Sequence, residues 1–426
     1  MSFSFIHISD IHLGRPFSGL SKFAYDEKIN DLYKTAVEKA FYNAIEYAII
    51  KNVDFVFIAG DTFDSDEQDF SSKLTLKEGL KKLADADIDV YLICGNHDPV
   101  NSYNKNTFNY DIDSKIKIIG LNTPKYLDID LCNKNGEKVA CLHSLSFTDE
   151  KMNEDPLNYF SKVSDSNTFN IGLLHCDLNA EAISQYAPCN INEIKGFSYD
   201  YWALGHIHVP SLNDDIIQYA GTIQGRNTKE TGPHGIRYIK VENNKIVKNN
   251  FIPMDIIRFE DILIDISNLD DSTDILTKIE DELYKVTNQD KNLCELFLTR
   301  LYLTGFTKFY SELNDEFYNV IADRIKTNSY NKIYISQIIN ETIPNIDENI
   351  LKEDEGIVGK VYNTAINQDI IQKVYTETEE KYKNLIASCN FIQQDYNSFA
   401  QNILQKSKEE CLNLCSFLFE SESKED

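Results

Sequence analysis

The sequence predicts an α/β fold in which one or two β-sheets are covered by helices. Short apolar runs alternate with segments of helical periodicity over the first 250 residues, and turn residues follow several of these runs. A strand–helix–strand order comes early and closely spaced strands follow it, which is typical of sheets packed against helices. The expected strands span residues 3–9, 53–59, 89–94, 115–119, 139–142, 170–174 and 201–204, with helices near 22–51 and 70–86.

Changes of pattern divide the 426 residues into three expected domains. The length exceeds that of one ordinary domain. A main domain over residues 1–252 is followed by a small α+β accessory domain over 253–340 and by a linker with a helical C-terminal region over 341–426. Residues 341–360 are polar and acidic and suit a linker, and an amphipathic helix near 398–419 would serve either core packing or partner docking.

The composition limits the class of protein. No run of about 18 apolar residues is present and the amino terminus has no basic segment before an apolar one, so we expect no membrane span, no signal peptide and a cytoplasmic location. Nine cysteines without a C-x-x-C pair argue against a disulfide framework and a zinc ribbon. The net charge is −26, and it counts against tight nonspecific binding of this chain alone to a long DNA duplex.

Five short polar motifs follow or end apolar strand-like runs. They are DIH at 10–12, GDTFD at 60–64, GNHD at 95–98, the histidine of GLLHCD at 175, and GHIH at 205–208. Residues at the carboxyl ends of strands gather on one rim of an α/β sheet. Each motif alone could be an ordinary turn, but five of the eight histidines fall within the set. Carboxylates, an amide and imidazoles together predict a site for Mn²⁺, Fe²⁺ or Zn²⁺.

The order D-x-H, G-D-x-x-D, G-N-H-D, H and G-H-x-H resembles that of the calcineurin-like metallophosphoesterases. The segments FIHISDIHLG, DYWALGHIHVP and YAGTIQGRNTKETGPHG are similar to the SbcD-type DNA repair exonucleases, and within them to the bacterial YhaO subgroup. The resemblance covers about residues 3–235. It implies that the main domain is a β-sandwich flanked by helices.

The resemblance also implies a centre of two divalent metal ions, with Mn²⁺ expected first and Fe²⁺ or Zn²⁺ as the alternatives. The implied ligands are Asp10, His12 and His208 for one metal, Asn96, His175 and His206 for the other, and Asp61 as a bridge between them. His97 would face the scissile phosphate, and Asp98 would orient His97. Asp64 stands where some SbcD-like relatives carry a histidine that helps to position DNA, which leaves such a role at this place open.

The activity implied is that of a DNA nuclease, a 3′–5′ exonuclease and single-strand endonuclease in DNA repair or end processing. Two cations about 3.5–4 Å apart can clamp a phosphate and activate a hydroxide that attacks phosphorus. A histidine such as His97 can then give a proton to the departing 3′-oxygen. The implied partners are DNA and an SMC-like ATPase subunit of the SbcC/YhaN type, and a homodimer is a further expectation.

Two alternatives stay open beside the nuclease. One is a small-molecule phosphodiesterase or protein phosphatase of the same superfamily, although the second motif lacks the Arg-Gly that follows it in many Ser/Thr phosphatases. The other is a non-catalytic scaffold protein, although every expected ligand is present. Arg226 follows Gly225 and is expected either to contact substrate phosphate or to be a plain surface residue.

Overall fold

The computed structural model describes most of the first 367 residues. The described residues are 2–14, 17, 27–64, 69–105, 108–163, 168–178, 184–211, 215–269, 271–287, 294–344 and 348–367, together with 369–370, 373, 376–377, 380–381, 406, 410 and 414–415. Two compact units are present, Met1–Asp261 with Thr287–Thr299 and Ser329–Ser336, and Ile262–Val286 with Arg300–Asn328 and Gln337–Asp426. The helix expected near 398–419 lies almost wholly outside the described residues.

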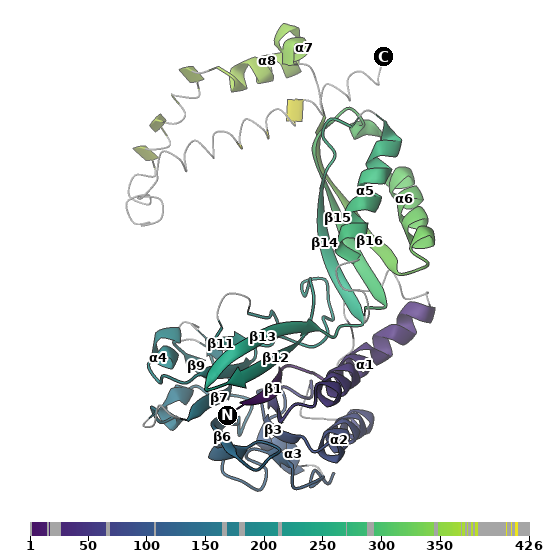
Figure 1. Cartoon of the computed structure of the whole chain (residues 1–426). Coiled ribbons are helices and arrows are strands. Elements are labelled where there is room, and N and C mark those ends of the chain that lie inside the picture. Colours follow the sequence, from purple (N-terminus) through teal and green to yellow (C-terminus); the bar gives the residue numbers. More distant parts are fainter. Residues whose placement is uncertain are drawn as a thin grey trace. The chain divides into compact units, whose positions relative to one another are not determined.

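The first unit contains a six-stranded sheet in the order β13-β12-β1-β2-β3-β4 (Figure 1). Its strands are β1 (Ser2–Ile8), β2 (Phe55–Ala59), β3 (Asp89–Ile93), β4 (Ile116–Ile118), β12 (Gly235–Glu242) and β13 (Lys245–Pro253). The strands β1 to β4 pair in parallel, because the chain returns between them through α1 (Glu27–Lys51), α2 (Phe70–Asp85) and α3 (Val100–Lys105). The strands β12 and β13 add an antiparallel edge.

The hairpin of β12 and β13 was not among the expected strands, although the sequence holds a signal for it. Buried and half-buried residues alternate along β12, as expected for a strand with one covered face. Asn243 and Asn244 join the two strands with φ angles of 52° and 59°. Two successive left-handed residues are the requirement of a two-residue type I′ turn, which asparagine tolerates.

A second sheet of the same unit has five strands in the order β11-β10-β7-β6-β5. They are β5 (Tyr126–Cys132), β6 (Lys138–Leu145), β7 (Phe169–His175), β10 (Tyr201–Gly205) and β11 (Ile217–Tyr219), and only β5 among them pairs antiparallel. The shorter elements near this sheet are the 3₁₀ turn Pro156–Tyr159, β8 (Asp177–Leu178), β9 (Pro188–Cys189) and α4 (Ile191–Lys195).

The two sheets pack face to face around an aromatic core. Phe5 and Phe57 of the first sheet share one buried apolar cluster with Ile171 and Tyr201 of the second. The rings of Phe5 and Tyr201 meet edge to face, with their centroids 5.2 Å apart. A separate buried cluster joins α1 and α2 to the other face of the first sheet. The expected α/β fold, a β-sandwich flanked by helices, is confirmed.

The ends of five parallel strands meet on one rim of this sandwich. The first three motifs follow β1, β2 and β3, and the last two end β7 and β10. Backbone hydrogen bonds join the loops: Asp10 N–H donates to the Gly60 carbonyl (3.1 Å), His12 N–H to the Asp61 carbonyl (3.0 Å), and Cys176 N–H to the Gly205 carbonyl (3.1 Å). The loops are therefore held to one another by the main chain as well as by their side chains.

The remaining strands form a three-stranded sheet in the order β14-β15-β16. Its elements are β14 (Ile257–Asp265), α5 (Ser272–Thr287), β15 (Leu296–Thr307), the 3₁₀ turn Tyr310–Glu312, α6 (Asp315–Asn328) and β16 (Ile333–Pro344). Polar residues such as Gln337 and Glu341 hid the length of β16 in the sequence. The helices α7 (Glu348–Glu353) and α8 (Ile357–Ala365) lie in the segment expected to be a linker. The division into three domains stays a prediction.

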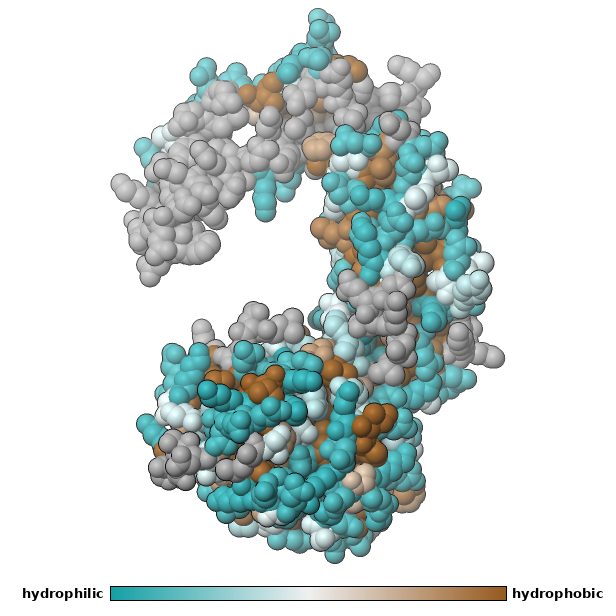
Figure 2. Space-filling view, viewed as in Figure 1, coloured by the Kyte–Doolittle hydropathy of each residue, from teal (hydrophilic) through white to brown (hydrophobic). Residues whose placement is uncertain are grey.

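Hydrophilic side chains cover most of the viewed face of each unit (Figure 2), in line with the high content of charged residues. Among the described residues, no helix combines the length and the apolar character that crossing a bilayer requires.

His7 is a fully buried histidine in the middle of the sandwich. Its Nε2 lies 3.1 Å from the carbonyl oxygen of Leu204 and its Nδ1 lies 3.1 Å from the Tyr201 hydroxyl. A carbonyl can only accept, so Nε2 carries the proton and Nδ1 accepts from Tyr201. Burial lowers the pKa of His7 to about 3, and the nearby Arg237 cation contributes to the same shift. His7 is therefore neutral in the folded protein.

This neutral histidine makes stability depend on pH. As pH falls below about 6.5, the unfolded chain takes up a proton at His7 that the folded protein does not, so the free energy of unfolding falls by up to about 1.4 kcal/mol per pH unit until the folded pKa is reached. His7→Gln removes the titrating group, so we expect a shallower decline between pH 6 and pH 4 in urea unfolding. Both proteins are measured in EDTA to exclude metal release, and equal slopes would contradict the prediction.

Candidate metal centre

Strained backbone marks the rim where the motifs meet. Asp10, His12 and Asp61 have φ angles of 49°, 52° and 49°, and His206 has a φ of 106°. Residues other than glycine rarely adopt positive φ, and each such position costs on the order of 1–3 kcal/mol. Four of them within one group of loops indicate that the side chains are needed where the backbone alone would favour glycine.

Asp10, His12 and His208 form the first group of donors, with their ligand atoms within 4.8 Å of one another. The Nδ1 atom of His12 lies 3.2 Å from Asp64 Oδ1, and that of His208 lies 2.7 Å from Glu230 Oε1. Each Nδ1 atom faces a carboxylate and therefore carries the proton, so both Nε2 atoms keep a lone pair. These two Nε2 atoms are only 3.1 Å apart, an arrangement that a cation beside them would stabilise.

The second group of donors has the same character. His175 Nδ1 lies 2.9 Å from the Ala59 carbonyl, so it carries the proton and leaves the lone pair on Nε2. That Nε2 faces Asn96 Oδ1 at 3.0 Å and Asp61 Oδ2 at 3.5 Å. Asn96 Oδ1 also lies 3.2 Å from His206 Nδ1. Burial, helped by the charge of His175, lowers the pKa of His206 to about 4, so His206 is a neutral imidazole able to bind a metal.

Asp61 lies between the two groups. Its Oδ2 is 3.5 Å from His175 Nε2 and 3.8 Å from His12 Nε2, while its Oδ1 accepts the His97 N–H at 2.9 Å. Burial raises the pKa of Asp61, and the neighbouring Asp10 charge raises it further against the opposing effect of His175. Gly95 permits this crowding, because a Cβ at that position would overlap the Asp61 carboxylate.

These seven residues fit two divalent cations. Carboxylates, imidazoles and one amide oxygen suit borderline metals such as Mn²⁺, Fe²⁺ and Zn²⁺. Lone pairs of several acceptors face one another at about hydrogen-bond distance with no proton assigned between them, and a buried excess of carboxylates stands among them. All seven predicted ligands are brought together, while the assignment of each to one metal stays a prediction.

The structure places His97 and Asp98 in different surroundings. His97 Nδ1 lies 2.8 Å from the Asp64 carbonyl, and the His97 ring lies 5.0 Å from that of His12. The buried Asp98 carboxylate accepts from the N–H groups of Asp61 (3.1 Å) and Thr62 (2.9 Å) and from the Tyr103 hydroxyl (3.0 Å). Asp98 therefore shapes the loop that presents Asp61, and its predicted influence on His97 runs through that loop.

Asp64 has two contacts that its place in the motif did not predict. Its carboxylate faces His12 Nδ1, and its backbone carbonyl accepts from His97 Nδ1. The residue thus orients one expected ligand and the expected proton donor together.

Glu230 is a site residue that sequence reasoning missed. It lies in the quoted segment YAGTIQGRNTKETGPHG, 22 positions after His208, and nothing in that spacing predicts that the two meet. Burial alone would raise the pKa of Glu230, but the hydrogen bond from His208 and the Arg226 charge outweigh it and lower the pKa to about 2. An ionised Glu230 therefore holds the Nδ1 proton of His208 in place.

Arg226 supports the same pair of residues. Its side chain is only 2% exposed, and its Nη2 lies 3.3 Å from His208 Nδ1 and 3.6 Å from Glu230 Oε1. Its backbone N–H donates to the other Glu230 oxygen at 2.7 Å. The plain surface role weighed for Arg226 is wrong, because the side chain is buried, and contact with substrate phosphate stays a prediction.

Replacing Glu230 tests its hold on His208. Glu230→Gln keeps the shape but removes the charge that fixes the imidazole, so we expect the affinity for Mn²⁺ to fall about tenfold, the low end of such effects. Calorimetric titration of the metal-free protein measures it. Glu242→Gln is the matched control, because Glu242 is a half-exposed carboxylate that pairs with Lys240 and not with a histidine. Equal affinities in the two variants would rule out the supporting role.

Comparison with known proteins agrees with this geometry. Residues 3–210 match the family model described as calcineurin-like phosphoesterase. The chain is 28% identical over 306 residues to the uncharacterized metallophosphoesterase YhaO of Bacillus subtilis, covering 71% of this chain and 72% of that protein. It is 26% identical over 371 residues to the DNA double-strand break repair protein Mre11 of Methanococcus maripaludis, covering 84% and 93%.

The D component of the nuclease SbcCD of Staphylococcus epidermidis is 24% identical over 271 residues, covering 58% of this chain and 69% of that protein. The resemblance drawn from the motifs is thereby confirmed. Residues 3–210 of this chain are a domain of the calcineurin-like metallophosphoesterases, a family of hydrolases that act on phosphate esters.

Proposed function

We propose that the protein is a metal-dependent DNA nuclease that hydrolyses phosphodiester bonds in DNA repair or end processing. The observation that carries the proposal is the pair of donor groups that share Asp61, with His97 beside them. The names of the relatives, a double-strand break repair protein and a component of a nuclease, favour DNA as the substrate. Activity as a 3′–5′ exonuclease and single-strand endonuclease is the finer form of the proposal.

The metal ligands would be the seven residues described above. When bound, two divalent cations, Mn²⁺ in the first place, supply positive charge for the phosphate and lower the pKa of a water molecule. Asp61 would keep the two cations close together. His12 and His208 would present neutral Nε2 atoms, because Asp64 and Glu230 hold their Nδ1 protons.

His97 would act on the leaving group. Its Nδ1 proton is engaged by the Asp64 carbonyl, so the other nitrogen, Nε2, is the one available to the substrate. A proton on Nε2 would pass to the departing 3′-oxygen, while the hydrogen bond to Asp64 keeps the ring in orientation. Asp98 would hold the same loop through the backbone of Asp61 and Thr62.

The charge of the chain favours a complex over a lone enzyme. A net charge of −26 repels DNA, so affinity for the duplex would come from a second protein, for which we propose an SMC-like ATPase. A homodimer would be compatible with the same arrangement. The printed name of one relative, a component of a nuclease, agrees with such an assembly.

A small-molecule phosphodiesterase is the alternative that an assay must exclude. Incubating the Mn²⁺-loaded protein with an end-labelled single-stranded oligonucleotide, beside a cyclic or dinucleotide diester, separates the two. We expect stepwise shortening of the oligonucleotide. Turnover of the small diester alone would refute the nuclease, and no turnover of either with metal bound would support the scaffold.

His97→Ala should separate catalysis from metal binding. Loss of a general acid costs a factor of about 10² to 10⁴ on DNA, whereas a nitrophenyl diester departs without needing a proton and should be affected much less. The rates on both substrates are compared with metal content measured in parallel. Equal loss on the two substrates, or a missing metal, would remove His97 from the role of acid.

Asp61→Ala should abolish activity and lower bound metal more than any other single ligand substitution. The expected bridge serves both cations, and its loss leaves their charges unscreened from each other. Elemental analysis of the purified variant measures the metal content, with Asp111→Ala as an exposed carboxylate control. A metal content equal to that of the control would count decisively against the bridge.

A further inference from the structure

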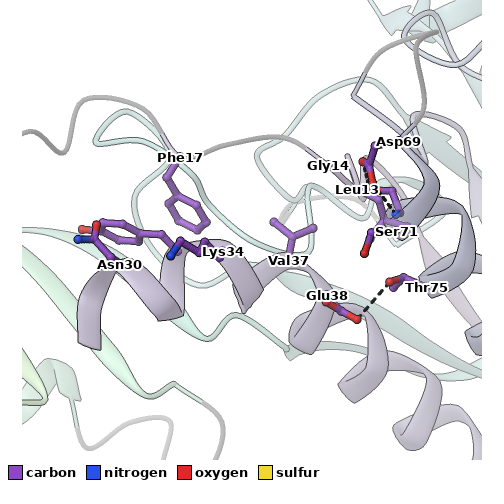
Figure 3. Close-up of a pocket in the computed structure, with 12 residues that line it drawn as sticks. Leu13, Gly14, Phe17, Asn30, Lys34, Val37, Glu38, Asp69, Ser71 and Thr75 are labelled. Carbon is purple, nitrogen blue, oxygen red and sulfur yellow. Dashed lines mark hydrogen bonds between the residues drawn. The ribbon is translucent and has the colours of Figure 1, made fainter. Parts of the chain in front are cut away.

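A pocket of about 420 Å³ lies directly beside the metal centre, and the proposed hydrolysis does not use it (Figure 3). It is enclosed by the loop after His12, the outer face of α1 and the first turns of α2. Its volume is in the range of pockets that bind small molecules. The metal centre and this pocket share a wall, because Leu13 and Gly14 follow the ligand His12 without interruption.

That shared wall is held rigidly. Leu13 N–H donates to the Thr62 carbonyl at 2.8 Å, and Asp64 N–H donates to the Leu13 carbonyl at 3.3 Å. The segment that positions His12 and Asp64 at the metal centre is therefore the same segment that closes one end of the pocket. A substrate with a phosphate at the metals has its neighbouring groups close to this opening.

One end of the pocket is aromatic. Phe17 stacks on Tyr33 with ring centroids 5.0 Å apart and an interplanar angle of 24°. Phe17 is only half-buried, and it lies at the end of the pocket opposite Gly14 and Asp69 (Figure 3). A planar ring placed on such a stacked pair extends it, and each stacked nucleobase contributes about tenfold or more to binding in comparable sites.

The rest of the pocket is acidic. Glu38 keeps its carboxylate at the pocket floor, where Oε1 accepts the Thr75 hydroxyl at 3.1 Å. Asp69 caps α2, and its Oδ1 accepts the Ser72 N–H at 2.9 Å. Lys34 is the basic residue among those that line the pocket, and it lies 74% exposed beside Asp31. Two carboxylates against one exposed cation disfavour a phosphate inside the pocket and favour groups that donate N–H bonds.

We propose that this pocket binds an unpaired guanine base of the nucleic acid whose backbone is cleaved, an inference that rests on the proposed nuclease function. Guanine combines a flat ring for Phe17 with two adjacent donors, N1–H and the N2 amino group, for Glu38 or Asp69. Adenine and cytosine offer one amino group each. Thymine would turn carbonyl oxygens toward the carboxylates. The expected order of affinity is therefore guanine first, adenine and cytosine next, and thymine last.

Nucleoside binding tests the pocket without any cleavage. Deoxyguanosine, deoxyadenosine, deoxycytidine and thymidine are titrated into the full-length, metal-free protein, and binding is followed by saturation-transfer NMR. We expect deoxyguanosine to bind about tenfold more tightly than thymidine, in line with the discrimination that a paired donor edge supplies. Phe17→Ala and Glu38→Gln should each weaken deoxyguanosine binding about tenfold.

Matched controls separate the pocket from general effects of substitution. Phe70→Ala removes an aromatic ring that is 68% exposed outside the pocket, and Glu46→Gln neutralises an exposed carboxylate farther along α1. Both should bind deoxyguanosine as the parent protein does. Thermal unfolding of all four variants identifies any that are destabilised. Equal binding of thymidine, or equal behaviour of pocket and control variants, would overturn the proposal.

The outcome is distinguishable from failure of the nuclease function. A protein that binds deoxyguanosine in the absence of metal, yet cleaves no oligonucleotide when loaded with Mn²⁺, keeps the guanine pocket and refutes the nuclease. A protein that shortens oligonucleotides but shows no preference among the nucleosides keeps the nuclease and refutes the pocket.

Discussion

Buried negative charge is the constraint on which the arrangement of the metal centre depends. Asp10 and Asp61 lie at the closed end of the rim with His175, almost without exposure to solvent, and Asp61 has a raised pKa because burial disfavours its charged form. Hydrogen bonds from the protein do not remove this cost, since the imidazoles around the carboxylates point lone pairs inward. Two divalent cations would satisfy the carboxylates and the lone pairs together, and the rest of the site is arranged to keep the imidazoles in that state.

The partners behind the ligands perform this task. Asp64, Glu230 and the Ala59 carbonyl each take the Nδ1 proton of one histidine, so the ligand nitrogen is defined before any metal arrives. The backbone strain at Asp10, His12, Asp61 and His206 has the same origin, because these side chains must converge from loops on two sheets. The aromatic core between the sheets supplies the stability that offsets this strain.

Charge also organises the surroundings of the centre. The chain as a whole is acidic, the pocket beside the metals is acidic, and the basic Arg226 is buried against Glu230 and His208. Such a surface attracts a nucleic acid through metals, stacking and specific donors more than through phosphate contacts. A basic partner protein and an unpaired base in the pocket are two consequences of the same charge distribution.

The sequence by itself determined the α/β fold, the positions of most strands and the seven expected ligands, because strand ends, glycines and histidines leave a periodic record along the chain. Only the tertiary structure decided the partners of those ligands. Glu230 lies 22 residues from His208, and Asp98 reaches the Asp61 loop across 37 residues, so their contacts follow from the closure of the sandwich and not from local pattern. The pocket between the two helices and the loop after His12 has the same origin. Its aromatic and acidic walls come from separate helices and loops, which no spacing in the sequence connects.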